Sequence, residues 1–493
     1  MGSLMGWWLV LYLLPLLVPP AQGSLMAHDE GYYALQGRWI VETGDWVTPQ
    51  WWGEPLFDRT IGLQVLMALS FALWGRSEWS ARLPSLLAAG VSSGLLVWIG
   101  RQLGLGRAAW LGGMILPLMG LWIHYAHLAT QDGVLVAVEL AGVAALLQAE
   151  RSQHWLWPLL AGSMVGVGFW VKGVMIGVPV LALLPVLIQG GHGRRPALYL
   201  GLFLGGLPVL GWLGAAVGRY GWDPLVQLFG KVLLLSQAEW HPGNGWFYYF
   251  WNIPLNSFPW VFVALGGIPL LRGVRPRLYL LVYPGLMLLI LTLFRTRTPY
   301  YALQLYPWIA LLAGVSLDHL VGLYGQGRRP LWGLALDLLG VLGIPLLVLP
   351  GWVAVLAPYR LLLGIVAVGW LGLSVFWHWR RLPPRVWLGL WLVPLWLAIA
   401  LGVRQGLLSD FSPQIKAGIP SLPDPMHFVV ADEPQGEAHK TWILLGFYAP
   451  TLGQRVRDWQ QLPSGSLAWL SPGALLPAPA IAEVEGWHLV RIP

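Results

Sequence analysis

The chain has 493 residues, of which 57% are hydrophobic and only 10% are charged, whereas charged residues make up about 25% of an ordinary soluble domain. This composition excludes a soluble globular enzyme and predicts an integral membrane protein. The absence of cysteine excludes disulfide bonds and thiol catalysis. The net charge of +7 comes from short basic clusters between apolar runs, a pattern that indicates membrane orientation rather than nucleic-acid binding.

Thirteen apolar runs are long enough, or nearly so, to cross a bilayer as helices. They are residues 5–25, 83–100, 108–123, 133–149, 156–171, 174–189, 197–217, 251–271, 278–294, 301–322, 331–353, 360–378 and 386–404. The first run also resembles a signal peptide, because Ala21-Gln22-Gly23 would suit a cleavage site. No Lys or Arg precedes the run, however, and cleavage would leave Asp29 almost at a new N-terminus, so we expect it to remain as the first crossing.

Basic residues between the runs give the orientation. With the N-terminus inside, their loops all fall on one face, which the positive-inside rule makes cytoplasmic. The residues are Arg101, Arg107, Arg151, Arg194, Arg195, Arg272, Arg275, Arg277, Arg328, Arg329, Arg380, Arg381 and Arg385. Another apolar stretch, Ile61 to Trp74, would reverse this pattern if it crossed the membrane, and its length of about 14 residues is short for a crossing. We therefore predict that it forms a helix in the membrane interface.

Residues 26–82 then form one long external loop with two juxtamembrane helices. The first helix is predicted from about Glu30 to Thr43. Asp29 is its expected N-cap and Gly44 its expected stop, because a short acidic side chain suits the first position and glycine suits the left-handed turn that ends a helix.

The composition changes after Arg404, where charged residues become frequent and long apolar runs end. We predict an all-α polytopic transmembrane domain at residues 1–404, with about 13 transmembrane helices, and a small external α/β domain at 405–493. In the second domain the apolar patterns predict strands at 427–432, 441–445 and 486–492 and a short helix at 409–417.

The predicted external loops carry both acids and bases, and an ionisable group at a membrane boundary is costly to keep without a use. The set is Asp29, Glu30, Asp58, Arg59, His124, His127, Asp132, Lys172, Lys231, Glu239, His241, Arg295 and Arg297. A transferase that uses a lipid-phosphate sugar needs such a set: a carboxylate takes the proton from an acceptor hydroxyl, and cations stabilise the departing phosphate. Arg295 and Arg297 stand out because they oppose the positive-inside trend.

Structural interpretations compete with these roles. Asp29 would cap the first juxtamembrane helix, and Glu30 would interact with the dipole of its first turn. Asp132 stands at the entrance of a predicted crossing, where an N-cap is common. Lys172 would extend its side chain to the membrane interface.

Two histidines raise the question of a metal. His124 and His127 are three residues apart, and with Asp132 or His28 they would form a divalent metal site. Interfacial histidines with ordinary hydrogen bonds are more common, so the sequence predicts no metal with certainty and indicates no other cofactor.

The order of several short motifs resembles the GT-C glycosyltransferases, in particular the branch that contains the protein O-mannosyltransferases and the lipid A aminoarabinose transferase. The resemblance covers roughly residues 1–325. The motifs are Asp29-Glu30-Gly31-Tyr32-Tyr33-Ala34, Gly44-Asp45-Trp46-Val47-Thr48-Pro49, Phe57-Asp58-Arg59, Arg82-Leu83-Pro84-Ser85, Asp132, Lys172-Gly173, and Thr298-Pro299-Tyr300-Tyr301 before Tyr306-Pro307. One motif departs from the family pattern, because Asp58-Arg59-Thr60 stands where Glu-Lys-Pro is usual.

The resemblance implies an inverting transferase that moves a hexose or pentose from a polyprenyl-phosphate donor to a hydroxyl of a lipid, glycan or protein. It implies a bacterial inner membrane protein whose site faces the periplasm. Asp29 would be the catalytic base and Asp132 a second acid. The full set of candidates has Asp29, Asp132 and Glu30 as catalytic residues, Arg59, Lys172, Arg295 and Arg297 at the donor phosphate, and Tyr33, Asp58, Tyr300 and Tyr301 in contact with substrate.

A lipid or glycan transporter is the alternative function, because it would also have many crossings and intramembrane charges. Transporters often contain internal repeats, and the two halves of this chain show no convincing one. A long external first loop that holds the acids also fits alternating access poorly. These observations favour the enzyme.

Overall fold

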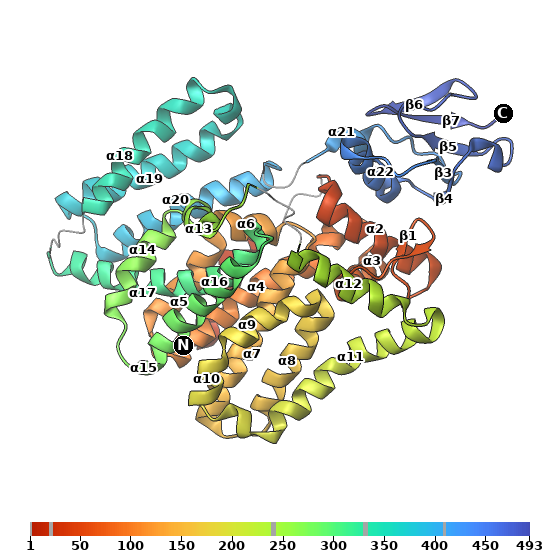
Figure 1. Ribbon diagram of the computed structural model, residues 1–493. Helices are drawn as coiled ribbons and strands as arrows, with labels where there is room; N and C mark the ends of the chain where they lie inside the picture. Colours follow the sequence, from red (N-terminus) through yellow and green to blue (C-terminus); the bar gives the residue numbers. More distant parts are fainter. Residues whose placement is uncertain (1, 19–22, 238–242, 329–333, 408–410) are drawn as a thin grey trace.

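The computed structural model describes residues 2–18, 23–237, 243–328, 334–407 and 411–493 (Figure 1). It confirms the predicted fold class, a helical membrane protein with a small C-terminal sheet domain. The helices outside the first loop and the C-terminal domain are α1 (Gly2–Leu17), α4 (Glu78–Gln102), α5 (Arg107–Ile115), α6 (Gly120–Ala126), α7 (Gln131–Ser152), α8 (Leu156–Lys172), α9 (Gly177–Ala182), α10 (Leu184–Gln189), α11 (Pro196–Tyr220), α12 (Asp223–Gln237), α13 (Tyr248–Asn256), α14 (Trp260–Gly267), α15 (Val274–Arg277), α16 (Tyr283–Leu293), α17 (Tyr306–Gly325), α18 (Leu334–Val348), α19 (Arg360–Trp379) and α20 (Pro384–Arg404).

Fewer stretches than the thirteen predicted crossings are long and apolar enough to span a membrane. Among the described residues there are nine, or eleven if two bent helix pairs, α5 with α6 and α13 with α14, each make one crossing. The predicted runs nevertheless all contain helix. The difference lies in α1, which has only 16 residues, and in the runs 156–171 and 174–189, of which Leu156–Ala182 counts as one stretch.

The chain turns back inside that stretch. Gly173 has φ 56° and ψ −137° and ends α8. A Cβ at Gly168 would lie 2.6 Å from Cδ1 of Ile176, whereas residues eight positions apart in one helix are about 12 Å apart. The segment Gly173–Ile176 therefore folds back against α8 before α9 begins.

Opposite ends of α7 carry the two groups of polar residues that the sequence assigned to opposite faces. Asp132 lies in its first turn, and Glu150 near its last turn pairs with Arg275 at 2.6 Å. Arg195 donates to the carbonyl of Ala149 at the same end (2.9 Å). Eighteen residues of helix span about 27 Å, close to the thickness of the hydrocarbon core. The arrangement is consistent with the predicted sides of the membrane.

The first loop contains α2 (Tyr32–Thr43), the hairpin of β1 (Gln50–Trp51) and β2 (Glu54–Pro55), and α3 (Gly62–Trp74). Helix α2 ends at Gly44 with a left-handed φ of 69°, as predicted. The predicted N-cap was wrong: Gly31 holds that position, and no side chain caps the helix. Helix α3 has 13 residues and is too short to cross the membrane.

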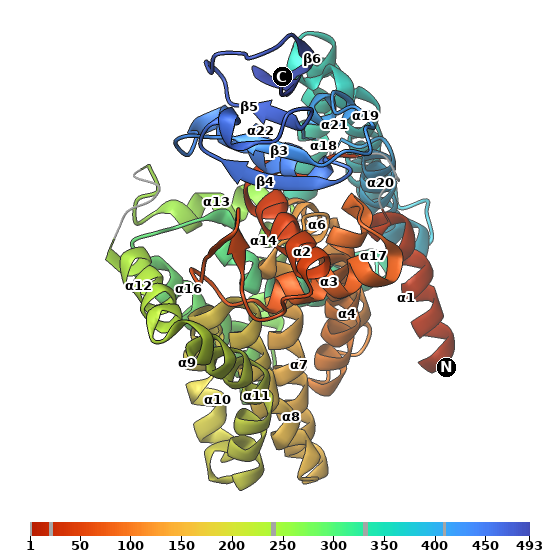
Figure 2. The same cartoon turned by 90° about the vertical axis from the view of Figure 1, so that its right-hand side faces the viewer.

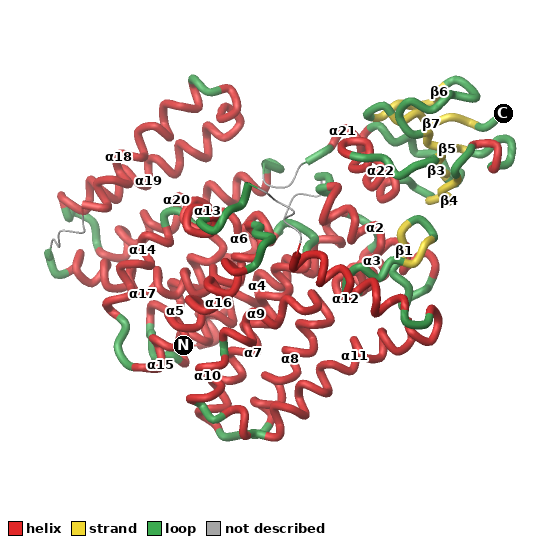
Figure 3. Tube along the Cα trace, in the orientation of Figure 1, coloured by secondary structure: helices red, strands yellow, loops and turns green. Residues whose placement is uncertain are grey.

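The C-terminal domain lies over α2 and α3 (Figures 1 and 2). Its five strands pair in the order β4-β3-β5-β7-β6 (Figure 3). The elements are α21 (Pro413–Ala417), β3 (Met426–Val429), α22 (Gly436–Tyr448), β4 (Leu452–Val456), β5 (Leu467–Leu470), β6 (Ala480–Val484) and β7 (Trp487–Arg491). Strands β3 and β7 and helix α21 match predicted elements, although residues 409–410 of the predicted helix lie outside the described residues.

The strand predicted at 441–445 was wrong, because these residues lie inside α22. Trp442, Ile443 and Leu444 are all buried, since the helix packs between the sheet and the first loop. A short run that is apolar on every side does not distinguish a buried strand from a buried helix by its period. The sequence also did not reveal β4, β5 and β6.

Candidate active site

A short turn, Ala27–Gly31, presents Asp29 at the start of the first loop. Asp29 has φ 56° and ψ −81°, a rare conformation for a residue with a side chain. Asp29 is half-buried, and no side-chain cap hydrogen bond is formed at the start of the turn or of α2. Strained backbone of this kind costs of order 1–3 kcal/mol and persists only where the surroundings fix it.

Glu30, the next residue, makes many of the contacts that hold the Asp29 turn in place. Its carboxylate accepts hydrogen bonds from Arg82 (2.7 and 2.9 Å), from the backbone N–H of Met26 (2.8 Å) and from the backbone N–H of Ala129 (2.8 Å). Glu30 is fully buried, and Arg82 is 2% exposed. Both oxygens of Glu30 are therefore engaged in holding the turn against α4 and the loop before α7.

Asp132 and Lys172 form an ion pair between α7 and α8. Thr130, not Asp132, is the N-cap of α7, and Lys172 precedes the turn at Gly173. The ammonium group of Lys172 also lies 5.0 Å from the ring centre of Tyr300 and 5.4 Å from that of Tyr301. These two tyrosines belong to the short helical segment Pro299–Leu305 before α17. The predicted cation Lys172, the predicted acid Asp132 and the two predicted tyrosines thus lie together.

Arg59 contributes a second cation. It pairs with both oxygens of Asp58 (3.0 and 2.7 Å), and its guanidinium carbon lies 4.5 Å from the ring centre of Tyr32 and 5.1 Å from that of Tyr33. The Tyr33 hydroxyl donates to Oε1 of Gln131 at 3.3 Å, which ties the first loop to α7. Burial raises the pKa of Tyr33 to about 12, so the phenol remains protonated and available as a donor.

Electrostatic coupling joins Asp29 to this group. Asp29 interacts with Asp132, Tyr33, Tyr300 and Tyr301. Five of the predicted site residues, from the first loop, α7 and the segment before α17, therefore lie near enough to influence one another electrostatically. Lys172 and Arg59 contact members of this group.

Other predicted residues lie apart from this group or have structural partners. Arg297 is 4% exposed and donates to the carbonyls of Thr292 and Asn244, with the ring centre of Trp246 at 4.9 Å. Arg295 is exposed in the same loop, and Lys231 lies on α12. The predicted residues Glu239 and His241 lie outside the described residues.

The two histidines have separate surroundings. His127 is fully buried, and its Nδ1 lies 2.8 Å from the carbonyl oxygen of Ile123. Burial lowers the pKa of His127 to about 4. The ring of His124 packs against Tyr125 and Phe411. In the described part of the chain, no three His, Asp or Glu residues are grouped so that they would hold a metal ion.

Sequence reasoning missed the roles of Arg82 and Gln131. Arg82 begins the motif Arg82-Leu83-Pro84-Ser85. Like Arg295, it is an arginine on the predicted external side, and this departure from the positive-inside trend could have indicated its role. Gln131 directly precedes Asp132 but carries no charge, so only its contact with Tyr33 reveals it.

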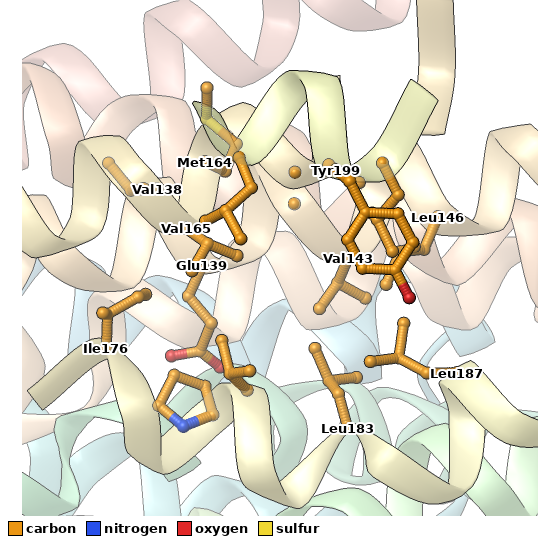
Figure 4. Close-up of a pocket in the computed structure, with 17 residues that line it drawn as sticks. Val138, Glu139, Val143, Leu146, Met164, Val165, Ile176, Leu183, Leu187 and Tyr199 are labelled. Atoms are coloured by element: carbon orange, nitrogen blue, oxygen red, sulfur yellow. The ribbon is translucent and has the colours of Figure 1, made fainter. Parts of the chain in front are cut away.

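An apolar cavity of about 160 Å³ lies deeper between α7, α8, α9, α10 and α11 (Figure 4). Its walls include Val143, Val165 and Leu183, and its one carboxyl group belongs to Glu139. The Glu139 carboxyl accepts a hydrogen bond from the Tyr283 hydroxyl at 2.7 Å. The lining residues of α7 begin six positions after Asp132, or about 9 Å further along the helix axis. The cavity is thus separate from the group around Asp29 and lies below it.

Known proteins share both the sequence pattern and the fold. The model of the dolichyl-phosphate-mannose-protein mannosyltransferases matches residues 58–213. The undecaprenyl phosphate-alpha-4-amino-4-deoxy-L-arabinose arabinosyl transferase of Edwardsiella ictaluri is 25% identical over 90% of this chain and 85% of its own length. The crystal structure of ArnT from Cupriavidus metallidurans bound to undecaprenyl phosphate has a TM-score of 0.78 at 19% identity, covering 99% of this chain and 97% of that one. The apo oligosaccharyltransferase of Archaeoglobus fulgidus has a TM-score of 0.53 at 10% identity, covering 90% and 63%.

The fold and these similarities define an integral membrane glycosyltransferase of the GT-C class. Within that class the chain is similar to the aminoarabinose transferases. The predicted enzyme class is confirmed, and the transporter alternative gains no support.

Proposed function

We propose that the protein transfers a monosaccharide, a pentose of the aminoarabinose kind, from an undecaprenyl-phosphate donor to a hydroxyl of a lipid, glycan or protein. Relatives whose names state an undecaprenyl-phosphate aminoarabinose donor support the donor. The observation that carries the proposal is the strained Asp29, which interacts electrostatically with Asp132, whose partner is Lys172, and with Tyr33, against which Arg59 lies.

The residues suit the chemistry of an inverting displacement. Asp29 takes the proton from the acceptor hydroxyl as the acceptor oxygen forms its bond to the anomeric carbon. The bond from that carbon to the phosphate oxygen breaks, and its electron pair stays on the phosphate. Lys172 and Arg59 stabilise the developing negative charge. Asp132 holds the ammonium group of Lys172 in place.

The deeper apolar cavity suits the lipid part of such a donor. Its lining residues on α8, Ala161 to Val165, lie seven to eleven positions before Lys172, which is about 10–17 Å along the helix axis. An isoprenoid tail that descends from a phosphate near Lys172 would reach it. The site would face the periplasm of a bacterial inner membrane, on the side opposite the basic loops.

Replacing Asp29 with asparagine tests the proposed base. The Asp29→Asn protein should fold normally, because the side chain makes no cap bond. Its turnover should fall by about 10²- to 10⁴-fold, since an amide does not accept the acceptor's proton. Transfer from an undecaprenyl-phosphate sugar would be measured in detergent together with thermal unfolding. Near-normal turnover of a folded Asp29→Asn protein would remove Asp29 from the mechanism.

A further inference from the structure

Helix α22 of the C-terminal domain packs directly on the turn that carries Asp29. A Cβ built at Gly31 would lie 2.9 Å from Cγ2 of Ile443 and 3.3 Å from Cδ2 of Leu444. The backbone N–H of Leu25, just before the turn, donates to the Tyr448 hydroxyl at 2.8 Å. The ring nitrogens of His28 and His439 are 3.1 Å apart. Contacts from α22 therefore reach both sides of Asp29.

Two glycines make this close approach possible. Gly31 has φ −62° and ψ −37°, an ordinary helical conformation that alanine adopts without strain, so its backbone does not require glycine. Gly446 lies inside α22, where a Cβ would lie 3.0 Å from Cζ2 of Trp52 and 3.2 Å from Cδ2 of Leu35. Glycine inside a helix is less favourable than alanine. The absence of a side chain at both positions is explained by the contact between α22 and the first loop.

Polar contacts fix the same interface. Arg38 of α2 is 1% exposed and donates to the carbonyls of Gly446, Phe447 and Ala449 at the C-terminal end of α22 (2.8, 3.2 and 2.8 Å). A cation at this end also interacts favourably with the helix dipole. Next to it, the rings of Trp52 and Trp442 stack at 4.8 Å with an interplanar angle of 4°. The domain is thus held at a defined position on the first loop.

A second set of bonds lies on the other side of the turn. The Ser24 hydroxyl accepts from the backbone N–H groups of Phe411 (3.1 Å) and Ser412 (2.6 Å). Lys416 of α21 pairs with Glu78 of α4 at 2.6 Å. The C-terminal domain therefore contacts the chain before, at and after the Asp29 turn.

We propose that α22 is a positioning element of the active site, which holds the Asp29 turn so that its carboxylate faces the acceptor. This inference rests on the proposed role of Asp29 as base. Glu30 and Arg82 fix the turn from the membrane side, and α22 fixes it from the opposite side. The ion pairs of the cations, Lys172 with Asp132 and Arg59 with Asp58, include no residue of the turn or of α22, although Arg59 also lies against the rings of Tyr32 and Tyr33. Loss of the α22 contact should therefore slow the chemical step and leave donor binding nearly unchanged.

A double-mutant experiment on the full chain tests the contact. In Gly31→Ala, the added methyl group collides with the side chain of Ile443. Ile443 is fully buried, so we expect the turn to shift. A displacement of about 1 Å should lower kcat by about 10²-fold, with the KM for the undecaprenyl-phosphate sugar unchanged. Adding Ile443→Ala removes the colliding methyl group and should raise kcat at least about tenfold above that of Gly31→Ala. Gly214→Ala is the matched control, because a Cβ at that helical glycine meets nothing within 4 Å.

A milder variant covers the case in which Gly31→Ala does not fold. Tyr448→Phe retains the ring and removes the hydroxyl, which accepts from the backbone N–H of Leu25 and also interacts with Glu78. The loss of that hydrogen bond should lower kcat by about 3- to 10-fold, again without a change in KM. His488→Ala, in β7 of the same domain and not in α22, serves as its control.

The outcomes separate this inference from the proposed function. Normal kcat in Gly31→Ala and Tyr448→Phe, together with an inactive Asp29→Asn, would overturn the positioning role alone. The positioning role would also be overturned if Gly31→Ala folds and adding Ile443→Ala does not raise its kcat. An active Asp29→Asn would overturn the proposed base. Both proposals would be supported if Gly31→Ala has a low kcat that Ile443→Ala restores and Asp29→Asn is inactive.

Discussion

At the residue scale, the charged side chains of the predicted external loops fall into two groups according to what they contact. Glu30 and Arg297 hold backbone: Glu30 accepts from two N–H groups and from Arg82, and Arg297 donates to two carbonyls. Lys172 and Arg59 instead contact acids and aromatic rings. A side chain that holds backbone contributes to stability, whereas Lys172 and Arg59, each beside an acid and a ring, are the cations that we propose bind the donor phosphate.

This division predicts different effects for two arginines. Arg59→Ala should weaken binding of the undecaprenyl-phosphate sugar about tenfold or more, because a charge-assisted hydrogen bond is worth about 1.5–3 kcal/mol. Arg59→Lys should restore only part of it, since lysine lacks the planar fork. Donor binding in detergent and thermal unfolding would be measured for each variant.

Arg297→Ala should behave in the opposite way. It leaves the carbonyls of Thr292 and Asn244 without a donor, at a cost of about 1–3 kcal/mol, so the midpoint of thermal unfolding should fall. The affinity of the folded protein for the donor should change by no more than about twofold, which is less than the loss of one hydrogen bond to the donor would cause. Arg297 bonds to backbone carbonyls instead. A stable Arg297→Ala protein with weakened donor binding would instead return Arg297 to the phosphate site that the sequence suggested.

At the scale of elements, the pair α7 and α8 connects the active site with the membrane interior. Their outer ends bear Asp132 and Lys172, and their middle parts line the apolar cavity with α9, α10 and α11. The tight turn at Gly173 brings Ile176 against α8, and Ile176 lines part of that cavity. One helical unit thus places Lys172, the proposed phosphate-binding cation, above an apolar chamber.

Filling the cavity should affect the lipid tail of the donor selectively. Gly142 lines it, and a Cβ there would lie 3.4 Å from Cβ of Met164, an ordinary contact. Gly142→Leu should therefore fold and occupy space meant for the tail. The KM should rise about tenfold for an undecaprenyl donor and much less for a donor with two isoprene units.

Gly214→Leu is the control, because the space beside that residue is open. Equal changes in KM for the long and the short donor in Gly142→Leu would show that the cavity does not receive the tail.

At the scale of the whole molecule, the active site lies between two units that are distant in sequence. The membrane helices supply Asp132, Lys172 and the tyrosines before α17, and the first loop supplies Asp29 and Arg59. The C-terminal domain covers this loop (Figure 2) and contacts it through α22. If the site faces the periplasm, the first loop and the C-terminal domain must share that side.

Single cysteines in this cysteine-free chain test the arrangement. Glu54→Cys, in the hairpin of the first loop, and Ser464→Cys, in the C-terminal domain, are at exposed positions. Both should react with a membrane-impermeant maleimide in intact cells. Ser152→Cys, exposed at the far end of α7, should react only after the membrane is permeabilised. Protection of either external cysteine would contradict the shared side.

The sequence by itself determined the membrane class, the positions of the apolar helices and the convergence of Asp29, Asp132, Lys172 and Arg59. Hydropathy and charge act between each segment and the bilayer, so they are readable along the chain without knowledge of the partners of any residue. Motif order added the enzyme class.

Only the tertiary structure decided the roles that depend on distant partners. Glu30 engages Arg82, which is 52 positions away, and Arg38 engages α22 across about 410 positions. The same holds for residues 441–445, whose helix is buried on all sides by the sheet and the first loop. Their apolar run fits two local structures equally well, and the choice between them came from packing that the local sequence does not contain.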